Sequence, residues 1–171
     1  IVYSTGSHQE LYDYTIKAFN TAWKYRIPTF VLGDGYQAKM RESLVMYDPE
    51  ERGIKMVPTE KIVGKEGMPG VDREPSHLRN TYNTEEELFQ VVEQLVKDFN
   101  KAAPEIVEHE EFECQDAEII IVAHGVVTRA AQATVKELRS QGKKVGHFRP
   151  ITLRPFPKEA MQKAITNAKE L

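Results

Sequence analysis

Two stretches of this chain alternate a short apolar run, a helical pattern and a second short apolar run. No other feature constrains the fold as strongly. The first stretch covers residues 1–33 and the second covers residues 117–150. A strand, a helix and a strand in about 30 residues form a βαβ unit, whose two strands lie parallel with a right-handed crossover. We therefore expect an α/β fold made of two parallel-sheet βαβ-type domains.

The first stretch has clear signals at its element boundaries. "IVYST" reads as a strand, and Ser7 and Glu10 form a capping box that opens a helix over residues 8–25. Pro28 follows this helix, and the apolar run "TFVLG" at residues 29–33 predicts a strand buried on both faces.

The second stretch repeats the pattern. Residues 119–123 predict a buried strand, apolar residues at helical spacing follow, and Gly142 ends the helix before the strand "KVGHF". Three prolines then rule out a central strand or a helix: Pro150, Pro155 and Pro157. We expect an ordered, extended connector that leads into a C-terminal helix. Three apolar side chains of the connector are expected to pack: Ile151, Leu153 and Phe156.

Two parallel strands do not make a stable sheet, because parallel sheets need neighbouring strands and helices on both faces. We expect further strands to come from sequence outside this chain or from another subunit. The chain also begins within a strand pattern and ends within a helical pattern that lacks a stop signal. This predicts that the 171 residues are a fragment of a longer polypeptide.

Three segments lie between the two units. Residues 34–48 predict a short helix, and residues 49–83 predict a long loop without periodicity. Thr84 and Glu87 form a second capping box, which opens an amphipathic helix that runs to about residue 102 and is followed by Pro104.

A run of acidic residues follows that helix. Seven carboxylates and no lysine or arginine lie between residues 105 and 118: Glu105, Glu108, Glu110, Glu111, Glu113, Asp116 and Glu118. Their spacing fits no calcium loop, so we interpret residues 104–115 as a solvated acidic linker. The predicted domains are residues 1–103 and 116–171, on either side of the linker.

Charge and composition exclude several classes of protein. The formal charge is −3, from 26 acidic and 23 basic residues, and provides no basic field for nucleic acid or an anionic membrane. The single cysteine, Cys114, forms no internal disulfide and does not by itself hold a zinc ion or an iron-sulfur cluster. No apolar run reaches the roughly 20 residues that span a bilayer. We predict a cytoplasmic protein without a nucleic-acid or membrane partner.

Few residues point to chemistry by spacing alone. The strand-to-helix turns "AHGVV" and "STGSHQE" resemble anion sites, but only one glycine of a nucleotide-binding fingerprint, Gly125, is present. A plain turn is the alternative at both places. The five histidines lack zinc-ligand spacing. Among them His77, in the long loop, is the best candidate for reactivity or ligand binding, and His147 reads as a core residue.

Two blocks resemble a known family: "STGSHQELYDYTIKAFNTAWKYRIPTFVLGDGYQAKMRE" and "AEIIIVAHGVVTRAAQATVKELRSQGKKVGHFRPITLRPFP". They look like the alpha subunits of 2-oxoacid:ferredoxin oxidoreductases, thiamine-diphosphate enzymes that convert 2-oxoacids to acyl-coenzyme A and pass electrons to ferredoxin. The connector "RPITLRPFP" is similar to the family's "RPITLWPFP", with Arg154 in place of tryptophan.

The resemblance implies how the chain is organised. Residues 1–103 would be the later part of a pyrimidine-binding domain, and residues 116–171 an incomplete transketolase C-terminal-like domain. The activating glutamate of the family would lie upstream of Ile1, which leaves the catalytic residues unknown. Thiamine diphosphate and Mg²⁺ would be shared with a beta subunit. Iron-sulfur clusters would lie in partner subunits, gamma and delta subunits included, which would pass electrons to ferredoxin.

The resemblance also implies candidate cofactor-binding residues: Asp34, Gly35 and His77. Its loop motif is reduced here to "EPSHLRNTYN", while "GDG" after the strand favours branched-chain 2-oxoacids over 2-oxoglutarate. The isolated chain would be inactive. Two alternatives stay open at this point, a non-catalytic assembly module of a multisubunit complex and a generic nucleotide-binding domain.

Overall fold

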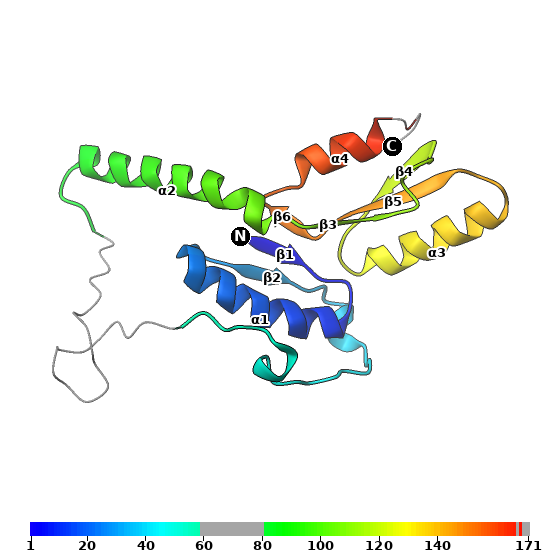
Figure 1. The fold of residues 1–171 in the computed structure, drawn as a ribbon, viewed down its shortest axis with the longest axis horizontal. Coiled ribbons are helices and arrows are strands. Elements are labelled where there is room, and N and C mark those ends of the chain that lie inside the picture. The colour runs from blue at the N-terminus through cyan, green and yellow to red at the C-terminus, as the bar shows by residue number, and fades with distance from the viewer. Residues whose placement is uncertain (59–80, 167, 169–171) are drawn as a thin grey trace.

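A computed structural model describes residues 1–58, 81–166 and 168 (Figure 1). Two small sheets lie side by side, and helices pack on them. The predicted α/β fold class and both predicted βαβ units are therefore confirmed. Among the described helices, none has both the length and the apolar character needed to cross a lipid bilayer.

The first sheet has the strand order β2-β1-β6. Strand β1 (Val2–Ser4) and strand β2 (Phe30–Leu32) are parallel and are joined by helix α1 (His8–Tyr25), whose predicted bounds are confirmed. Strand β6 (Thr152–Arg154) pairs antiparallel with β1.

The second sheet has the strand order β3-β5-β4. Strand β4 (Ile119–Val122), helix α3 (Val127–Ser140) and strand β5 (Val145–Pro150) form the second parallel βαβ unit. Strand β3 (His109–Phe112) pairs antiparallel with β5, and helix α4 (Lys158–Ile165) follows the proline segment with Pro157 at its N-cap.

Side-chain caps fix the start of the two long helices. The Ser7 hydroxyl accepts the amide of Glu10 at 3.1 Å and the Thr84 hydroxyl accepts the amide of Glu87 at 3.3 Å. Both capping boxes therefore begin their helices where the sequence predicts.

The core of the first sheet combines residues from distant parts of the chain. One cluster joins Ile1 and Tyr3 of the N-terminal strand, Ala18 of α1, and three residues far downstream: Ala102, Ile106 and Ile151. The second sheet has its own cluster: Cys114, Ala117, Ile120 and Phe148. His147 is 1% exposed, as expected for a core residue, and its Nε2 lies 3.2 Å from the Ala123 carbonyl.

Two expectations about the strands are wrong. We expected additional strands to come from outside the chain, but each sheet gains its third strand, β6 or β3, from the chain itself. We also expected β2 to be buried on both faces, whereas Phe30 is 58% exposed and Leu32 is 45% exposed. Strand β2 lies at the edge of the sheet, and one of its faces has no covering layer in the described part of the chain.

The acidic segment 104–115 is not a solvated linker along its whole length. Helix α2 spans Glu85–Ile106 and includes Pro104, and four further residues form β3. Pro104 lies in the last turn, where its missing amide removes one helical hydrogen bond, and the amide of Val107 still donates to the Ala103 carbonyl. The acidic side chains of β3 project from an edge strand, which is why they read as a linker.

The helix predicted at residues 34–48 is reduced to a single 3₁₀ turn at Gln37–Lys39. Side chains of α1 hold the rest of this segment in an irregular conformation: Gln9 accepts the Val45 amide, and the Tyr12 hydroxyl donates to the Tyr47 carbonyl at 2.7 Å. These bonds replace helical backbone bonds. In the predicted loop 49–83, a second 3₁₀ turn covers Glu50–Arg52.

The proline segment is ordered and extended, as predicted, but parts of it are strand. Strand β5 is central and ends at Pro150, where β4 has already stopped pairing, so the missing proline amide is tolerated. Ile151 is buried and Leu153 is half-buried, whereas Phe156 remains 44% exposed, contrary to our expectation.

Candidate functional site

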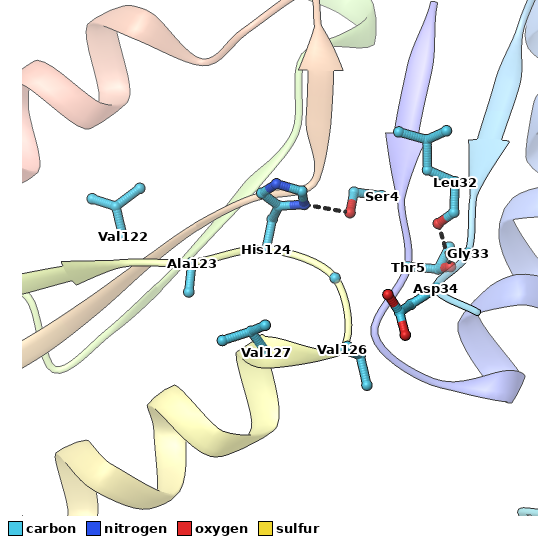
Figure 2. Close-up of a pocket in the computed structure, with 11 residues that line it drawn as sticks. Ser4, Thr5, Leu32, Gly33, Asp34, Val122, Ala123, His124, Val126 and Val127 are labelled. Atoms are coloured by element: carbon cyan, nitrogen blue, oxygen red, sulfur yellow. Dashed lines mark hydrogen bonds between the residues drawn. The ribbon is translucent and has the colours of Figure 1, made fainter. Parts of the chain in front are cut away.

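A cavity of about 470 Å³ lies where three parallel strands end, between the two sheets (Figure 2). It opens at the carboxyl ends of β1, β2 and β4, the position at which α/β folds bind ligands. Its walls are three segments that are far apart in the sequence: Ser4 and Thr5, Leu32 to Asp34, and Val122 to Val127.

Two strand-to-helix turns meet at one side of this cavity. The Ser4 hydroxyl and Nδ1 of His124 lie 2.9 Å apart and form a hydrogen bond between the two βαβ units (Figure 2). A Cβ atom on Gly6 would lie 2.8 Å from the carbonyl oxygen of Gly125, so only glycine permits this approach. Gly125 itself has φ 65°, a left-handed conformation that also favours glycine.

The opposite wall is fixed by hydrogen bonds between side chains and the backbone. The Thr5 hydroxyl donates to the Leu32 carbonyl at 2.9 Å, which ties the ends of β1 and β2 together. The carboxylate of Asp34 accepts the Tyr36 amide at 2.7 Å, and the buried Gln37 side chain accepts the Asp34 amide. Asp34 is thus held at the rim of the cavity with its carboxylate exposed to solvent.

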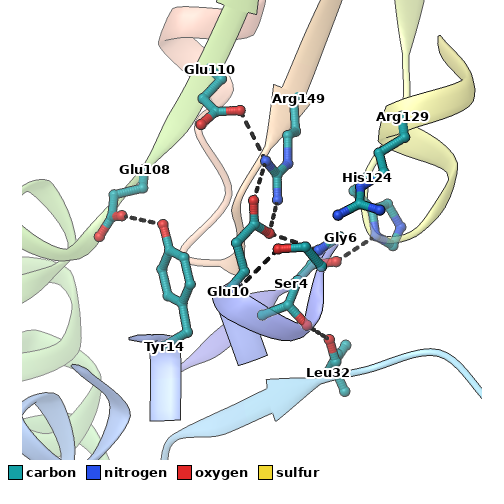
Figure 3. A network of polar contacts seen from close by, with 12 residues as sticks. Ser4, Gly6, Glu10, Tyr14, Leu32, Glu108, Glu110, His124, Arg129 and Arg149 are labelled. Atoms are coloured by element: carbon teal, nitrogen blue, oxygen red, sulfur yellow. Dashed lines mark hydrogen bonds and ion pairs between the residues drawn. The ribbon is translucent and has the colours of Figure 1, made fainter. Parts of the chain in front are cut away.

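A buried arginine lies behind the turn that carries Gly6 (Figure 3). The Arg149 side chain is 4% exposed, and its Nη1 atom lies 2.9 Å from carboxylate oxygens of both Glu10 and Glu110. Glu10 in turn accepts the Gly6 amide at 2.7 Å. The guanidinium therefore connects β5, β3 and the first turn of α1, and through Glu10 it reaches Gly6, whose neighbour Thr5 lines the cavity.

A second polar contact joins α1 to the start of β3 (Figure 3). The Tyr14 hydroxyl donates to the Glu108 carboxylate at 2.9 Å, and Lys17 pairs with the same carboxylate. Burial, followed by the charge of Glu108, raises the pKa of Tyr14. The Tyr14 phenol is therefore a neutral hydrogen-bond donor that joins α1 to the residue before β3.

The predicted site residues fall in different places. Asp34 lines the cavity, and Gly35 follows it but is not among the lining residues. His77 lies outside the described residues. The turns "STGSHQE" and "AHGVV", which the sequence offered as two separate candidates, meet at this one cavity. Sequence reasoning missed the bond between Ser4 and His124, although Ser4 is the last residue of β1 and His124 lies two residues after the end of β4.

The chemistry of the walls limits what the cavity holds. None of its lining residues is lysine or arginine, and the charged side chain among them is the Asp34 carboxylate. In the part of the chain that the structure describes, no three histidine, cysteine or acidic residues are placed to hold a metal ion. A neutral group with hydrogen-bond donors fits these walls better than a diphosphate.

Two family models together match almost the whole chain. Residues 1–111 match the model for the pyruvate flavodoxin/ferredoxin oxidoreductase thiamine diphosphate-binding domain. The chain belongs to the pyruvate flavodoxin/ferredoxin oxidoreductase family. Residues 117–171 match the model for pyruvate:ferredoxin oxidoreductase core domain II of this family. The resemblance to 2-oxoacid:ferredoxin oxidoreductases stated from the sequence is confirmed.

Curated members of the pyruvate flavodoxin/ferredoxin oxidoreductase family align along nearly the whole chain. The 2-oxoglutarate synthase subunit KorA of Methanocaldococcus jannaschii is 35% identical over 95% of the chain and 49% of its own length. The ketoisovalerate oxidoreductase subunit VorB of Methanothermobacter marburgensis is 33% identical over 95% of the chain and 44% of its own length. The chain thus spans about half the length of these relatives.

A solved structure has the same fold. It is a 2-oxoglutarate:ferredoxin oxidoreductase from Magnetococcus marinus with 2-oxoglutarate, coenzyme A and succinyl-CoA bound. The TM-score is 0.74 with 18% identity, over 99% of this chain and 33% of the other. At this identity the likeness establishes the shared fold of the pyruvate flavodoxin/ferredoxin oxidoreductase family.

Proposed function

We propose that this chain is part of the alpha subunit of a 2-oxoacid:ferredoxin oxidoreductase. The reaction is the oxidative decarboxylation of a 2-oxoacid to an acyl-coenzyme A, with electrons passed to ferredoxin. The match of residues 1–111 to a thiamine diphosphate-binding domain carries this proposal. The relatives named for 2-oxoglutarate, ketoisovalerate and pyruvate support it.

The cavity at the carboxyl ends of the strands is our candidate for this chain's share of the cofactor site. Thiamine diphosphate, when bound, supplies the carbanion chemistry of decarboxylation. The Asp34 carboxylate is placed to accept a hydrogen bond from an amino group, and Gly35 next to it leaves room for a close approach because no atom lies within 4 Å of its would-be Cβ. These walls fit the aminopyrimidine ring of thiamine diphosphate, which is neutral and carries the amino group.

The diphosphate and its Mg²⁺ need a different surface. The cavity walls carry no cationic side chain, and we assign the diphosphate and Mg²⁺ to a beta subunit. Iron-sulfur clusters would lie in partner subunits, gamma and delta included, which would deliver the electrons to ferredoxin in the cytoplasm. His77 remains a candidate that lies outside the described residues.

The domain division is also part of this proposal. Residues 1–103 would belong to the pyrimidine-binding domain and residues 116–171 to the transketolase C-terminal-like domain. The structure adds that β6, from the second part, completes the sheet of the first part. The substrate would be a branched-chain 2-oxoacid or 2-oxoglutarate, since relatives named for each are 33% and 35% identical to this chain.

The test uses the full-length protein assembled with its partner subunits. Ferredoxin reduction is measured with 2-oxoglutarate, 2-oxoisovalerate and pyruvate, with and without thiamine diphosphate. We expect cofactor-dependent reduction with one of these substrates. We expect Asp34→Ala to raise the concentration of thiamine diphosphate needed for half-maximal activity, and the exposed Asp48→Ala to leave it unchanged. A folded complex that is inactive on all common 2-oxoacids would favour a non-catalytic assembly module.

A further inference from the structure

Three buried polar atoms of the second βαβ unit have no hydrogen-bond partner among the described residues. They are Oγ1 of Thr128, Nδ1 of His147 and Nε of Arg149. These residues are 3%, 1% and 4% exposed, respectively. Buried polar groups in folded proteins are nearly always paired, either with other protein groups or with an ordered water molecule, because an unpaired one destabilises the fold. Three such atoms in one region point to a bound molecule.

The three side chains lie in one layer, between β5 and α3. Phe148 of β5 belongs to the core cluster on which α4 packs. Side chains alternate along a strand, so its neighbours His147 and Arg149 face the other side of the sheet, where α3 lies (Figure 1). The buried residues of α3 are spaced by three and four positions and therefore face the sheet: Thr128, Ala131 and Val135.

Contacts at the first turn of α3 bring the three side chains close together. The Gly125 carbonyl accepts the Thr128 amide at 3.1 Å. The same carbonyl oxygen lies 2.8 Å from the Cβ position of Gly6, and this position lies 3.6 Å from Nη2 of Arg149 (Figure 3). His147 precedes Arg149 by two positions on the same face of β5. All three unpaired atoms therefore lie around the first turn of α3.

The chemistry of the three atoms defines what can bind between them. The Ala123 carbonyl only accepts, so Nε2 of His147 carries the hydrogen and Nδ1 presents a lone pair. Burial lowers the pKa of His147, which keeps the ring neutral. Nε of Arg149 only donates, whereas the Thr128 hydroxyl can donate or accept. The bound molecule must therefore accept a hydrogen bond from Arg149 and donate one to His147.

We propose that one water molecule is bound between α3 and β5, where it accepts from Nε of Arg149, donates to Nδ1 of His147 and bonds to the Thr128 hydroxyl. Buried water molecules typically make about three hydrogen bonds to groups that would otherwise be unpaired. An anion would place its charge against the lone pair of His147, and a metal cation would face the guanidinium of Arg149. A neutral molecule of the size of water satisfies all three atoms.

This water joins the supports of both turns at the cavity. Thr128 belongs to the first turn of α3, whose start lines the cavity, and His147 bonds to the carbonyl of the lining residue Ala123. Arg149 holds the other turn through Glu10. The bound water therefore fixes the position of two cavity walls relative to each other. The water site itself does not depend on the proposed activity, because it is argued from hydrogen bonding alone.

The first experiment is a crystal structure of the full-length protein with its partner subunits, at a resolution that shows ordered water. We expect a density peak within about 3.2 Å of Thr128 Oγ1, His147 Nδ1 and Arg149 Nε. A direct bond between Thr128 and His147 without a peak would overturn the proposal. A bromide soak separates water from an anion, and an anomalous signal at the peak would exclude water.

Substitutions of Thr128 test the third contact. Thr128→Val keeps the shape of the side chain without its hydroxyl, so we expect it to lose the density peak and to lower the midpoint of thermal unfolding by a few degrees. Thr128→Ser keeps the hydroxyl and should keep the peak. Thr134→Val, at an exposed position of α3, is the matched control and should unfold like the wild type. A Thr128→Val variant that retains the peak would refute the contact with Thr128.

The cavity provides a second readout, which rests on the proposed function. We expect Thr128→Val to raise the thiamine diphosphate concentration for half-maximal ferredoxin reduction several-fold, and Thr128→Ser to restore it. An unchanged requirement in Thr128→Val would contradict the link between the water and the cavity. An inactive wild-type complex that shows the peak would contradict the proposed function alone, whereas an active complex without the peak would contradict the water site alone.

Discussion

Arg149 and Glu10 are 139 residues apart in the chain, yet Nη1 of Arg149 lies 2.9 Å from Oε1 of Glu10. The same guanidinium contacts Glu110 on β3, and Glu10 holds the Gly6 amide at the edge of the cavity. One buried cation therefore links both βαβ units to the turn that shapes the candidate site. This link ties the stability of the fold to the geometry of the cavity.

Replacing Arg149 should lower the free energy of unfolding. Arg149→Met leaves two carboxylates without their shared cation, and removal of one partner of a buried ion pair costs about 3–5 kcal/mol. Because Glu10 and Glu110 keep some contact with water, we expect a loss of about 2–3 kcal/mol in the free energy of unfolding, measured with urea. Arg129→Met, at an exposed ion pair with Glu42, should cost about 0–1 kcal/mol. Equal losses for the two variants would contradict the role of Arg149.

The contact between Gly6 and Gly125 leaves no space for a side chain. Gly6→Ala places a Cβ atom 2.8 Å from the Gly125 carbonyl oxygen, so the two turns must separate. Overpacking of this kind costs about 1–3 kcal/mol. Gly35→Ala, with no atom within 4 Å of its Cβ position, is the matched control and should leave thermal unfolding unchanged. A Gly6→Ala variant as stable as the control would show that the turns do not touch.

Glu42 makes the free energy of unfolding depend on pH in the acidic range. Its hydrogen bonds to the His8 side chain and amide, together with Arg129, hold the pKa of Glu42 at about 2, below the usual 4.5. A carboxyl group whose pKa is depressed by folding stabilises the fold above its unfolded pKa, and this contribution is lost as the pH falls from 4.5 to about 2. Glu42→Gln should therefore flatten the pH dependence of unfolding in this window. Glu51→Gln, at an exposed position, should keep it.

His147 gives a second pH dependence in a higher range. Burial lowers the pKa of His147 below its usual 6.5, since the charged imidazole is disfavoured in the core. The unfolded chain then binds a proton more readily than the folded one, so stability falls as the pH drops below 6.5 toward the folded pKa. Urea unfolding of His147→Gln at pH 7.5 and pH 5.5 should show a smaller difference than the wild type. An unchanged difference would assign the effect to other groups.

The sequence predicts those elements that local signals define. The capping boxes at Ser7 and Thr84 mark the starts of both long helices, and the apolar run "KVGHF" marks β5. The sequence does not predict strand β3, because its acidic side chains lie at a sheet edge, where polar residues are tolerated. The sequence does not predict strand β6, because prolines surround it. Its partner β1 is an equally short strand far away in the sequence, so no local pattern indicates the pairing.

The candidate site was predictable only in part. Asp34 became a candidate through the family resemblance, and it lines the cavity in the structure. The bond between Ser4 and His124 and the ion pair of Arg149 depend on how the two units pack, and no local pattern encodes that packing. Long-range polar contacts of this kind are visible only once the fold is known.

The register of β6 with β1 has a consequence for synthesis. Val2 pairs with Arg154, so β1 is synthesised long before the strand that pairs with its second edge. Until then β1 has an unpaired edge, and the core around Tyr3 lacks Ile151. The first βαβ unit is therefore poorly suited to fold during translation before β6 is made, and a variant without β6 would leave an edge of β1 unpaired and prone to aggregation.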